Sequence, residues 1–123
     1  MEKCLVLAVD DMAYMESFYT KSLKGLPVEV HFVSSGEEAC RVAEKLKPQL
    51  IFMDFLMPRM DGEATASIIR RMPGMEKAKI IAVTAIDEGE AASLSGFDAF
   101  LHKPVRADDL SDVVARCLGE AAE

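Results

Sequence analysis

The sequence predicts an α/β fold in which helices cover both faces of a five-stranded parallel sheet. Two observations support this prediction. Short apolar runs alternate along the chain with segments whose apolar residues recur at helical spacing, and this alternation is typical of βαβ units. Five such units account for nearly all of the 123 residues. We therefore expect a single domain at 1–123, with a core of about 3–118.

Two strands and two helices are predicted in the first part of the chain. The apolar run CLVLAV at 4–9 predicts a buried strand, and the bulky residues of 12–23 then recur at helical spacing. The segment VEVHFV at 28–33 alternates between apolar and polar residues, which predicts an edge strand with one wetter face. Ser35 and Glu38 have the spacing of a capping box and therefore predict the start of the second helix.

The third strand is predicted at 50–54, where LIFMD is apolar up to its final aspartate. A continuous apolar run of this length is typical of a central strand that is buried on both faces. Asp61 can cap the next helix. We expect the inner face of that helix to contain Ile68, Ile69 and Met72.

The last two strands are predicted at 79–85, KIIAVTA, and 99–103, AFLHK. Between them, 87–95 is short and weak as a helix because Gly89 lies inside it. The final helix is predicted by an apolar stripe at helical spacing, which consists of Leu110, Val113, Val114, Cys117 and Leu118.

Composition argues against several classes of function. The net charge is −7 and the basic residues are scattered, whereas direct binding of nucleic acid needs a clustered basic face. No apolar run approaches the ~18 residues of a membrane helix, and the start of the chain lacks a signal-peptide pattern, so we expect a cytoplasmic protein. None of the seven glycines forms a dinucleotide-binding or P-loop motif. Cys4, Cys40 and Cys117 lie far apart and are expected to be buried thiols.

Polar residues stand at the ends of four predicted strands. Asp10 and Asp11 follow the first strand, Asp54 ends the third, and Thr84 and Lys103 lie at the ends of the fourth and fifth. Because ligands bind where the carboxyl ends of parallel strands meet, we expect these side chains to share one rim. Each alone has a simpler explanation as a helix cap, turn residue, strand residue or solvated charge. It is less plausible that all five residues lie at one rim for five unrelated reasons than that they form one site.

Carboxylates that converge in this way need a compensating charge. Two of them ~4 Å apart repel by about 4 kcal/mol at an effective dielectric of 20, so either a proton or a divalent cation is expected to bind. Oxygen ligands without His or Cys favour Mg²⁺ over zinc. With Lys103 and Thr84 nearby, the site can hold a phosphoryl group. Asp54, which we expect to be only partly buried, is the candidate nucleophile for an aspartyl-phosphate.

Four motifs carry a resemblance to a known family: VDD at 9–11, MDFLMPRMDG at 53–62, VTA at 83–85 and LHKP at 101–104. Over essentially the whole chain, the sequence resembles a receiver domain of two-component response regulators, in the single-domain form of chemotaxis regulators. The resemblance implies a doubly wound, flavodoxin-like sheet of order 2-1-3-4-5. It also implies a phosphorylation-dependent switch that relays a signal by conformational change and protein docking.

The resemblance also implies roles for individual residues. Asp54 would accept a phosphoryl group from a phosphohistidine of a histidine kinase or a phosphotransfer protein. Asp10 and Asp11 would bind Mg²⁺ together with Asp54 and the backbone carbonyl of Leu56. Lys103 would pair with the phosphoryl oxygens. The downstream effector protein is not indicated by the sequence.

Further residues would serve the switch and the loops around it. Thr84 would move towards the phosphoryl group, and Phe100 would turn inward, although a core aromatic is the simpler explanation of Phe100. Pro58 would fix the loop after the nucleophile and Gly62 would permit close packing. A cis peptide would precede Pro104.

The chain departs from the family pattern in two places. The stretch 86–100 looks about one helical turn short, so the face around it is expected to be reshaped. Leu56 and Ile86 are apolar where polar groups can orient a hydrolytic water, so we expect slow self-dephosphorylation. His102 and His31 are interpreted as surface or packing residues rather than as parts of the site.

Two alternatives use the same residues. A haloacid-dehalogenase-type aspartate phosphatase places its nucleophile in a DxD motif after the first strand, where this chain has Asp10, Asp11 and Met12. A degenerate receiver that only docks partners would not need all of the polar residues at the rim. We therefore expect a phosphoacceptor that assists its own phosphorylation and dephosphorylation, and not a turnover enzyme.

Overall fold

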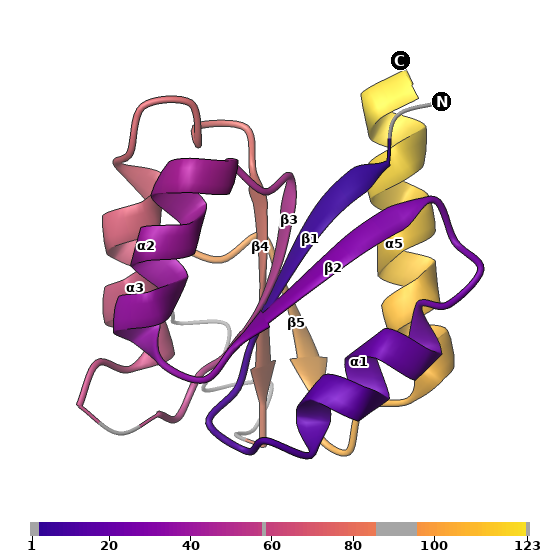
Figure 1. Ribbon diagram of the computed structural model, residues 1–123, viewed down its shortest axis with the longest axis horizontal. Helices are drawn as coiled ribbons and strands as arrows, with labels where there is room; N and C mark the ends of the chain where they lie inside the picture. Colours follow the sequence, from indigo (N-terminus) through magenta and orange to yellow (C-terminus); the bar gives the residue numbers. More distant parts are fainter. Residues whose placement is uncertain (1–2, 58, 86–95, 123) are drawn as a thin grey trace.

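The computed structural model describes residues 3–57, 59–85 and 96–122 (Figure 1). Their centre is a five-stranded parallel sheet in the order β2-β1-β3-β4-β5. The fold class and the strand order implied by the resemblance are therefore confirmed. The strands are β1 (Cys4–Val9), β2 (Val28–Val33), β3 (Leu50–Asp54), β4 (Lys79–Thr84) and β5 (Ala99–His102).

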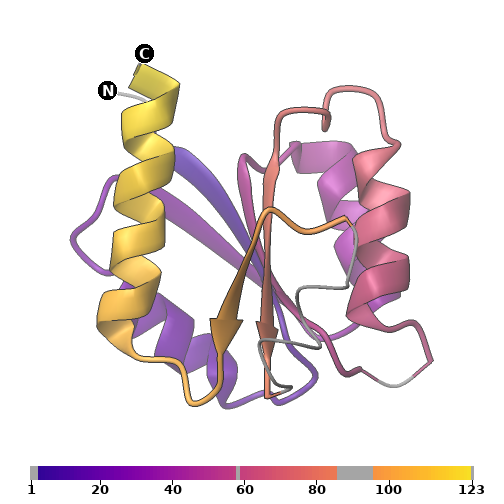
Figure 2. The same ribbon diagram turned by 180° about the vertical axis from the view of Figure 1, so that it is seen from behind.

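Helices cover both faces of the sheet, as the alternating sequence pattern predicts. Helices α1 (Met15–Ser22) and α5 (Ala107–Ala122) lie together on one face, and α2 (Gly36–Leu46) and α3 (Gly62–Arg70) lie together on the other (Figures 1 and 2). The weak helix predicted at 87–95 and the reshaped face expected around it lie outside the described residues. No helix in the described part of the chain has the length and apolar character needed to cross a membrane.

Alternate residues of the central strands fill two separate cores. Leu7 and Ile51 point to the core beneath α2 and α3, whereas Ala8 and Phe52 point to the core beneath α1 and α5. Every residue of β3 is buried, as predicted for a central strand. Because side chains alternate along a strand, the residues two places after Ala8 and Phe52 face α1 and α5 as well. This alternation gives Asp10 and Asp54 a common direction.

The predicted helix caps are present. The hydroxyl of Ser35 accepts a hydrogen bond from the backbone N–H of Glu38 at 3.2 Å, and the Glu38 carboxylate accepts one from that hydroxyl at 3.4 Å. Asp61 caps α3, because its Oδ1 accepts the N–H of Ala64 at 2.8 Å. These caps fix the start of α2 and of α3 at the ends of β2 and β3.

Two details of the predicted helices are wrong. Ile68 is 40% exposed, whereas the buried face of α3 consists of Gly62, Thr65, Ala66 and Ile69. Neighbouring residues are about 100° apart around a helix, so Ile68 cannot share the centre of that face with Ile69. The first helix begins at Met15 rather than at residue 12, because the preceding residues form a turn that Asp10 stabilises by accepting the N–H of Met12.

Candidate functional site

The site lies at the carboxyl ends of β1 and β3, which are neighbours in the sheet. Backbone hydrogen bonds continue past the end of each strand: the N–H of Asp10 donates to Val33 O at 3.2 Å, and that of Phe55 donates to Val83 O at 3.1 Å. These bonds hold the backbone of Asp10, and the backbone that follows Asp54, in the register of the sheet. The direction of both side chains is therefore set by the sheet and not by a flexible loop.

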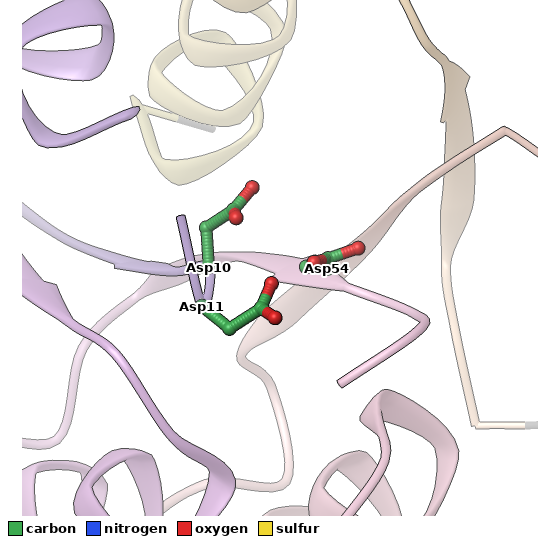
Figure 3. Close-up of side chains that lie close together, drawn as sticks. All are labelled: Asp10, Asp11 and Asp54. Atoms are coloured by element: carbon green, nitrogen blue, oxygen red, sulfur yellow. The ribbon is translucent and has the colours of Figure 1, made fainter. Parts of the chain in front are cut away.

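Three carboxylates meet at this rim (Figure 3). One oxygen from each of Asp10, Asp11 and Asp54 lies within 4.8 Å of the other two. Asp10 is 0% exposed and Asp54 is 4% exposed, while Asp11 is exposed. The predicted convergence is confirmed. The expectation that Asp54 is only partly buried is wrong, because its side chain ends a fully buried central strand and lies beside Asp10 and Lys103.

Lys103 supplies a positive charge to the two buried acids. Its Nζ lies 3.4 Å from Asp54 Oδ1 and 3.6 Å from Asp10 Oδ2. The backbone N–H of Lys103 donates to the carbonyl of Thr84 at 2.8 Å, which ties the end of β5 to the end of β4. The peptide between Lys103 and Pro104 is cis, as the resemblance implies.

The buried charges shift the acid–base properties of the site. Burial raises the pKa of Asp54 to about 6; the charge of Asp10 adds to this rise and that of Lys103 opposes it. Burial also raises the pKa of Asp10, although the N–H of Met12 and the Lys103 ammonium oppose the rise. Burial alone would lower the pKa of Lys103, but the charges of Asp10 and Asp54 outweigh it, so this pKa is raised. One ammonium thus faces two buried carboxylates.

The donor set fits a hard divalent cation. The oxygens of Asp10 have unequal surroundings: Oδ1 accepts the N–H of Met12 at 2.9 Å, whereas Oδ2 is buried and lacks a hydrogen-bond partner among the described residues. A buried carboxylate oxygen without a hydrogen bond is costly unless positive charge compensates it, and the Lys103 ammonium, 3.6 Å from Oδ2, is shared with Asp54. Carboxylates without His or Cys ligands suit a hard cation. Asp11, being exposed, leaves the cluster open to solvent.

The remaining predicted site residues lie in β4, in β5 and in the loop after β3. Thr84 is 2% exposed at the end of β4, and the side chain of Leu56 is 60% exposed in the loop after β3. The ring of Phe100 is half-buried and lies 5.9 Å, between centroids, from that of Phe97. Phe97 in turn lies 6.2 Å from Phe55, which follows the nucleophile candidate. The sequence reasoning missed this contact, because Phe97 stands outside any periodic segment.

Gly62 lies directly against the strand end that carries Asp54. Its N–H donates to Phe55 O at 2.9 Å, and a Cβ at this position would lie 2.5 Å from the Asp54 carbonyl oxygen. The close packing predicted for Gly62 is therefore confirmed. Pro58 and Ile86 lie outside the described residues.

Neither histidine belongs to the cluster of acids. His102 is exposed at the end of β5, and His31 pairs with Glu29 at 2.7 Å on the edge strand β2. Both positions agree with the interpretation as surface or packing residues.

The fold and the acidic rim are those of a receiver domain, and comparison with known proteins agrees. The chain matches the response regulator receiver domain family over residues 6–115. This chain belongs to that family. Such a domain is a phosphorylation-dependent signalling switch: a phosphoacceptor that histidine kinases phosphorylate, rather than a turnover enzyme. The alternatives of a dehalogenase-type phosphatase and a nucleotide-binding fold are not supported.

Three relatives illustrate the similarity. Response regulator protein VraR of Staphylococcus epidermidis is 35% identical over 115 residues, which are 90% of this chain and 54% of VraR. The crystal structure of a signal receiver domain, described as that of a Luxo repressor protein from Vibrio parahaemolyticus, is 32% identical. It superposes with a TM-score of 0.88 and covers 98% of this chain and 93% of that one.

The third relative is the receiver domain of the sensor histidine kinase PA1611 from Pseudomonas aeruginosa, whose crystal structure contains a magnesium ion coordinated in the active-site cleft. It is 27% identical, has a TM-score of 0.85, and covers 95% of this chain and 98% of that one. The chain spans 29%, 12% and 54% of the length of curated relatives that it matches.

Proposed function

We propose that Asp54 is the phosphoacceptor and that Asp10, Asp11 and Asp54 hold Mg²⁺ beside it, together with the backbone carbonyl of Leu56. The observation that carries the proposal is the convergence of three carboxylates within 4.8 Å, two of them buried, next to one ammonium. The magnesium ion in the cleft of the PA1611 receiver domain supports the choice of cation. When bound, Mg²⁺ would neutralise charge on the phosphoryl oxygens.

Asp54 would act as the nucleophile. One of its carboxylate oxygens attacks the phosphorus of a phosphohistidine, the P–N bond breaks, and the electron pair of that bond returns to the imidazole nitrogen. The pKa of about 6 means that this carboxyl is mostly ionised at neutral pH, as a nucleophile requires. The strand end holds it rigidly, because the following N–H is bonded to Val83. Rigid placement reduces the entropic cost of the transfer.

Lys103 would stabilise the phosphorylated state. Its Nζ lies 3.4 Å from Asp54 Oδ1, and an ammonium in that position can move to the phosphoryl oxygens once Asp54 is phosphorylated. The side chain is 31% exposed, so it has room to move. The donor would be a phosphohistidine of a histidine kinase or a phosphotransfer protein.

Thr84 and Phe100 would transmit the change, with Thr84 moving towards the phosphoryl group and Phe100 turning inward. The half-buried position of Phe100 in β5, next to the strand that ends in Thr84, supports this assignment. Leu56, being apolar and exposed beside Asp54, cannot orient a hydrolytic water, which supports slow self-dephosphorylation. The switch would then relay the signal by docking to an effector protein.

The extent and location of the domain are part of the same proposal. We propose one receiver domain at 1–123 with a core of about 3–118, supported by the family match at 6–115 and by the packing of Leu118 against the core beneath α1 and α5. We propose a cytoplasmic location, supported by Cys4 and Cys40, which are free thiols.

The test uses acetyl phosphate as a small phosphoryl donor with Mg²⁺, followed by intact-protein mass spectrometry. Wild type is expected to gain one phosphate, and the adduct should be absent from Asp54→Asn and from wild type in EDTA. Asp112→Asn is a matched control, because Asp112 is an exposed aspartate on α5. A full adduct on Asp54→Asn would rule out Asp54 as the acceptor. A second arm with a histidine-phosphorylated kinase domain tests the donor class.

A further inference from the structure

Tyr19 of α1 lies directly beneath the acidic rim. Its side chain is fully buried, and its ring lies 5.6 Å from Phe52 and 6.4 Å from Phe32, between centroids. Phe32 and Phe52 are both register partners of Ala8, on the two sides of β1. The ring therefore covers one row of side chains that runs across β2, β1 and β3.

The next row on this face contains the two buried acids. Asp10 follows Ala8 by two residues and Asp54 follows Phe52 by two residues, which places them about 7 Å farther along the strands. Helical side chains tilt towards the N-terminus of their helix. Helix α1 begins five residues after Asp10, so its N-terminus is near the rim (Figure 1). The ring of Tyr19 therefore carries its hydroxyl towards the acids.

Two buried polar atoms in this region lack a hydrogen-bond partner among the described residues: Tyr19 Oη and Asp10 Oδ2. One is a hydroxyl that can donate, and the other is a carboxylate oxygen that can only accept. Buried polar groups in folded proteins are almost always paired, directly or through water. Burial raises the pKa of Tyr19, and the charges of Asp10 and Asp54 raise it further, which agrees with a hydroxyl that stays protonated close to both carboxylates.

We propose that Tyr19 is a positioning residue for the cation site: its hydroxyl donates a hydrogen bond to one water molecule, which in turn donates to Asp10 Oδ2. This inference rests on the proposed binding of Mg²⁺. The N–H of Met12 already fixes the other oxygen of Asp10. A donor at Oδ2 therefore completes the orientation of this carboxylate as a cation ligand.

The role becomes important when Lys103 leaves Asp10. Its Nζ lies 3.6 Å from Asp10 Oδ2, which is longer than a hydrogen bond, and the proposed mechanism moves the ammonium towards the phosphoryl oxygens. Tyr19 is held by its ring between α1 and the sheet, so its hydroxyl remains in place during that movement. Outer hydrogen-bond partners of this kind orient metal ligands and tune affinity.

The test compares Tyr19→Phe with Tyr14→Phe. Both substitutions remove one phenolic hydroxyl and keep the ring, but Tyr14 is 69% exposed. The dissociation constant for Mg²⁺ is measured by titrating backbone amide NMR shifts with MgCl₂. We expect Tyr19→Phe to weaken Mg²⁺ binding by roughly tenfold, and Tyr14→Phe to bind as wild type does.

The outcomes separate the two proposals. Unchanged Mg²⁺ affinity in Tyr19→Phe, with saturable binding by the wild type, would overturn the role of Tyr19 and leave the cation site standing. The absence of saturable binding by the wild type would overturn the cation site itself. Tyr19→Phe keeps the phenyl ring, so it should leave the packing and the stability of the fold intact. A change confined to Mg²⁺ affinity would therefore be due to the loss of the hydroxyl.

A second measurement needs no substitution at Tyr19. The chain contains two tyrosines, so uniform labelling with 3-fluorotyrosine should produce two ¹⁹F resonances, which Tyr14→Phe assigns. Addition of MgCl₂ is expected to shift the Tyr19 resonance and to leave that of Tyr14 in place. A Tyr19 resonance that stays unchanged while the amides of Asp11 and Phe55 report saturation would contradict the proposed hydrogen bond.

Discussion

Replacing Asp54 by asparagine is expected to stabilise the metal-free protein. In the folded chain the pKa of this carboxyl is about 6, against an ordinary value of 3.8, because the group is buried next to Asp10. Each pKa unit corresponds to about 1.4 kcal/mol, so the ionised form of Asp54 costs about 3 kcal/mol of folding free energy at neutral pH. Asparagine has a similar shape and no charge. Asp54→Asn should therefore raise the free energy of unfolding by up to about 3 kcal/mol, or Tm by roughly 10 °C.

The sign of the pH dependence follows from the raised pKa. A carboxyl whose pKa is higher in the folded state binds its proton more tightly there, so wild type gains stability as the pH falls through about 6. The advantage of Asp54→Asn should be full near pH 7.5, about half as large near pH 5, and absent below the unfolded value of 3.8. Mg²⁺ should also reduce the advantage, because it binds the folded wild type and stabilises it by mass action.

The assay is urea unfolding followed by circular dichroism, in EDTA and in MgCl₂. Asp112→Asn serves as the control, since it removes an exposed carboxylate from α5 and should change stability by less than about 0.5 kcal/mol. If Asp54→Asn in EDTA at neutral pH is no more stable than wild type, the buried charge of Asp54 does not lower the free energy of unfolding. The reasoning about the rim would then be refuted.

Three further predictions concern the surroundings of the site. Lys103→Gln removes the ammonium that contacts both buried acids, so we expect about a hundredfold slower phosphorylation by acetyl phosphate, measured by intact mass; an unchanged rate would count against its role. Gly62→Ala places a Cβ 2.5 Å from the Asp54 carbonyl oxygen and should cost about 1–3 kcal/mol in urea unfolding, whereas Gly119→Ala on α5, which has open space, should not destabilise. Leu56→Asn, at a side chain that is 60% exposed, should speed loss of phosphate several-fold; an identical decay time course would contradict the proposed slow self-dephosphorylation.

The position of the site could be predicted because it depends on strand direction. In a parallel sheet all carboxyl ends lie at one edge, so locating the ends of the strands in the sequence is enough to bring Asp10, Asp54 and Lys103 together. The boundary of β3 was predicted to the residue, because its apolar run ends at a charge. The five predicted strands, which rest on this alternation between buried strands and amphipathic helices, are confirmed.

The predictions that are wrong concern quantities that depend on tertiary packing. Ile68 continues the apolar pattern of α3 in the sequence, but the direction of the helix relative to the sheet leaves it 40% exposed. The burial of Asp54 depends on how closely the side chains at the neighbouring strand ends approach it, and the sequence contains no direct signal of that distance. In the sequence, Tyr19 is only one of several bulky residues at helical spacing. The position of its ring against Phe32 and Phe52, one row of side chains before Asp10 and Asp54, depends on how α1 packs on the sheet, which the sequence does not specify.

The same tertiary packing explains why this rim can act as a switch. Burial makes the ionised pair of Asp10 and Asp54 unfavourable by itself, and one ammonium cannot neutralise both. Cation binding relieves that repulsion, whereas the proposed phosphorylation of Asp54 would place a more highly charged phosphoryl group at the same position. Each event therefore changes the free-energy difference between states that differ in the position of Lys103. The contacts of the Lys103 side chain depend on the charge at Asp54. The backbone N–H of Lys103 is also hydrogen-bonded to the Thr84 carbonyl. Lys103 can therefore couple phosphorylation to the ends of β4 and β5. A rim that was stable without cation or phosphate would have no such free energy to transmit.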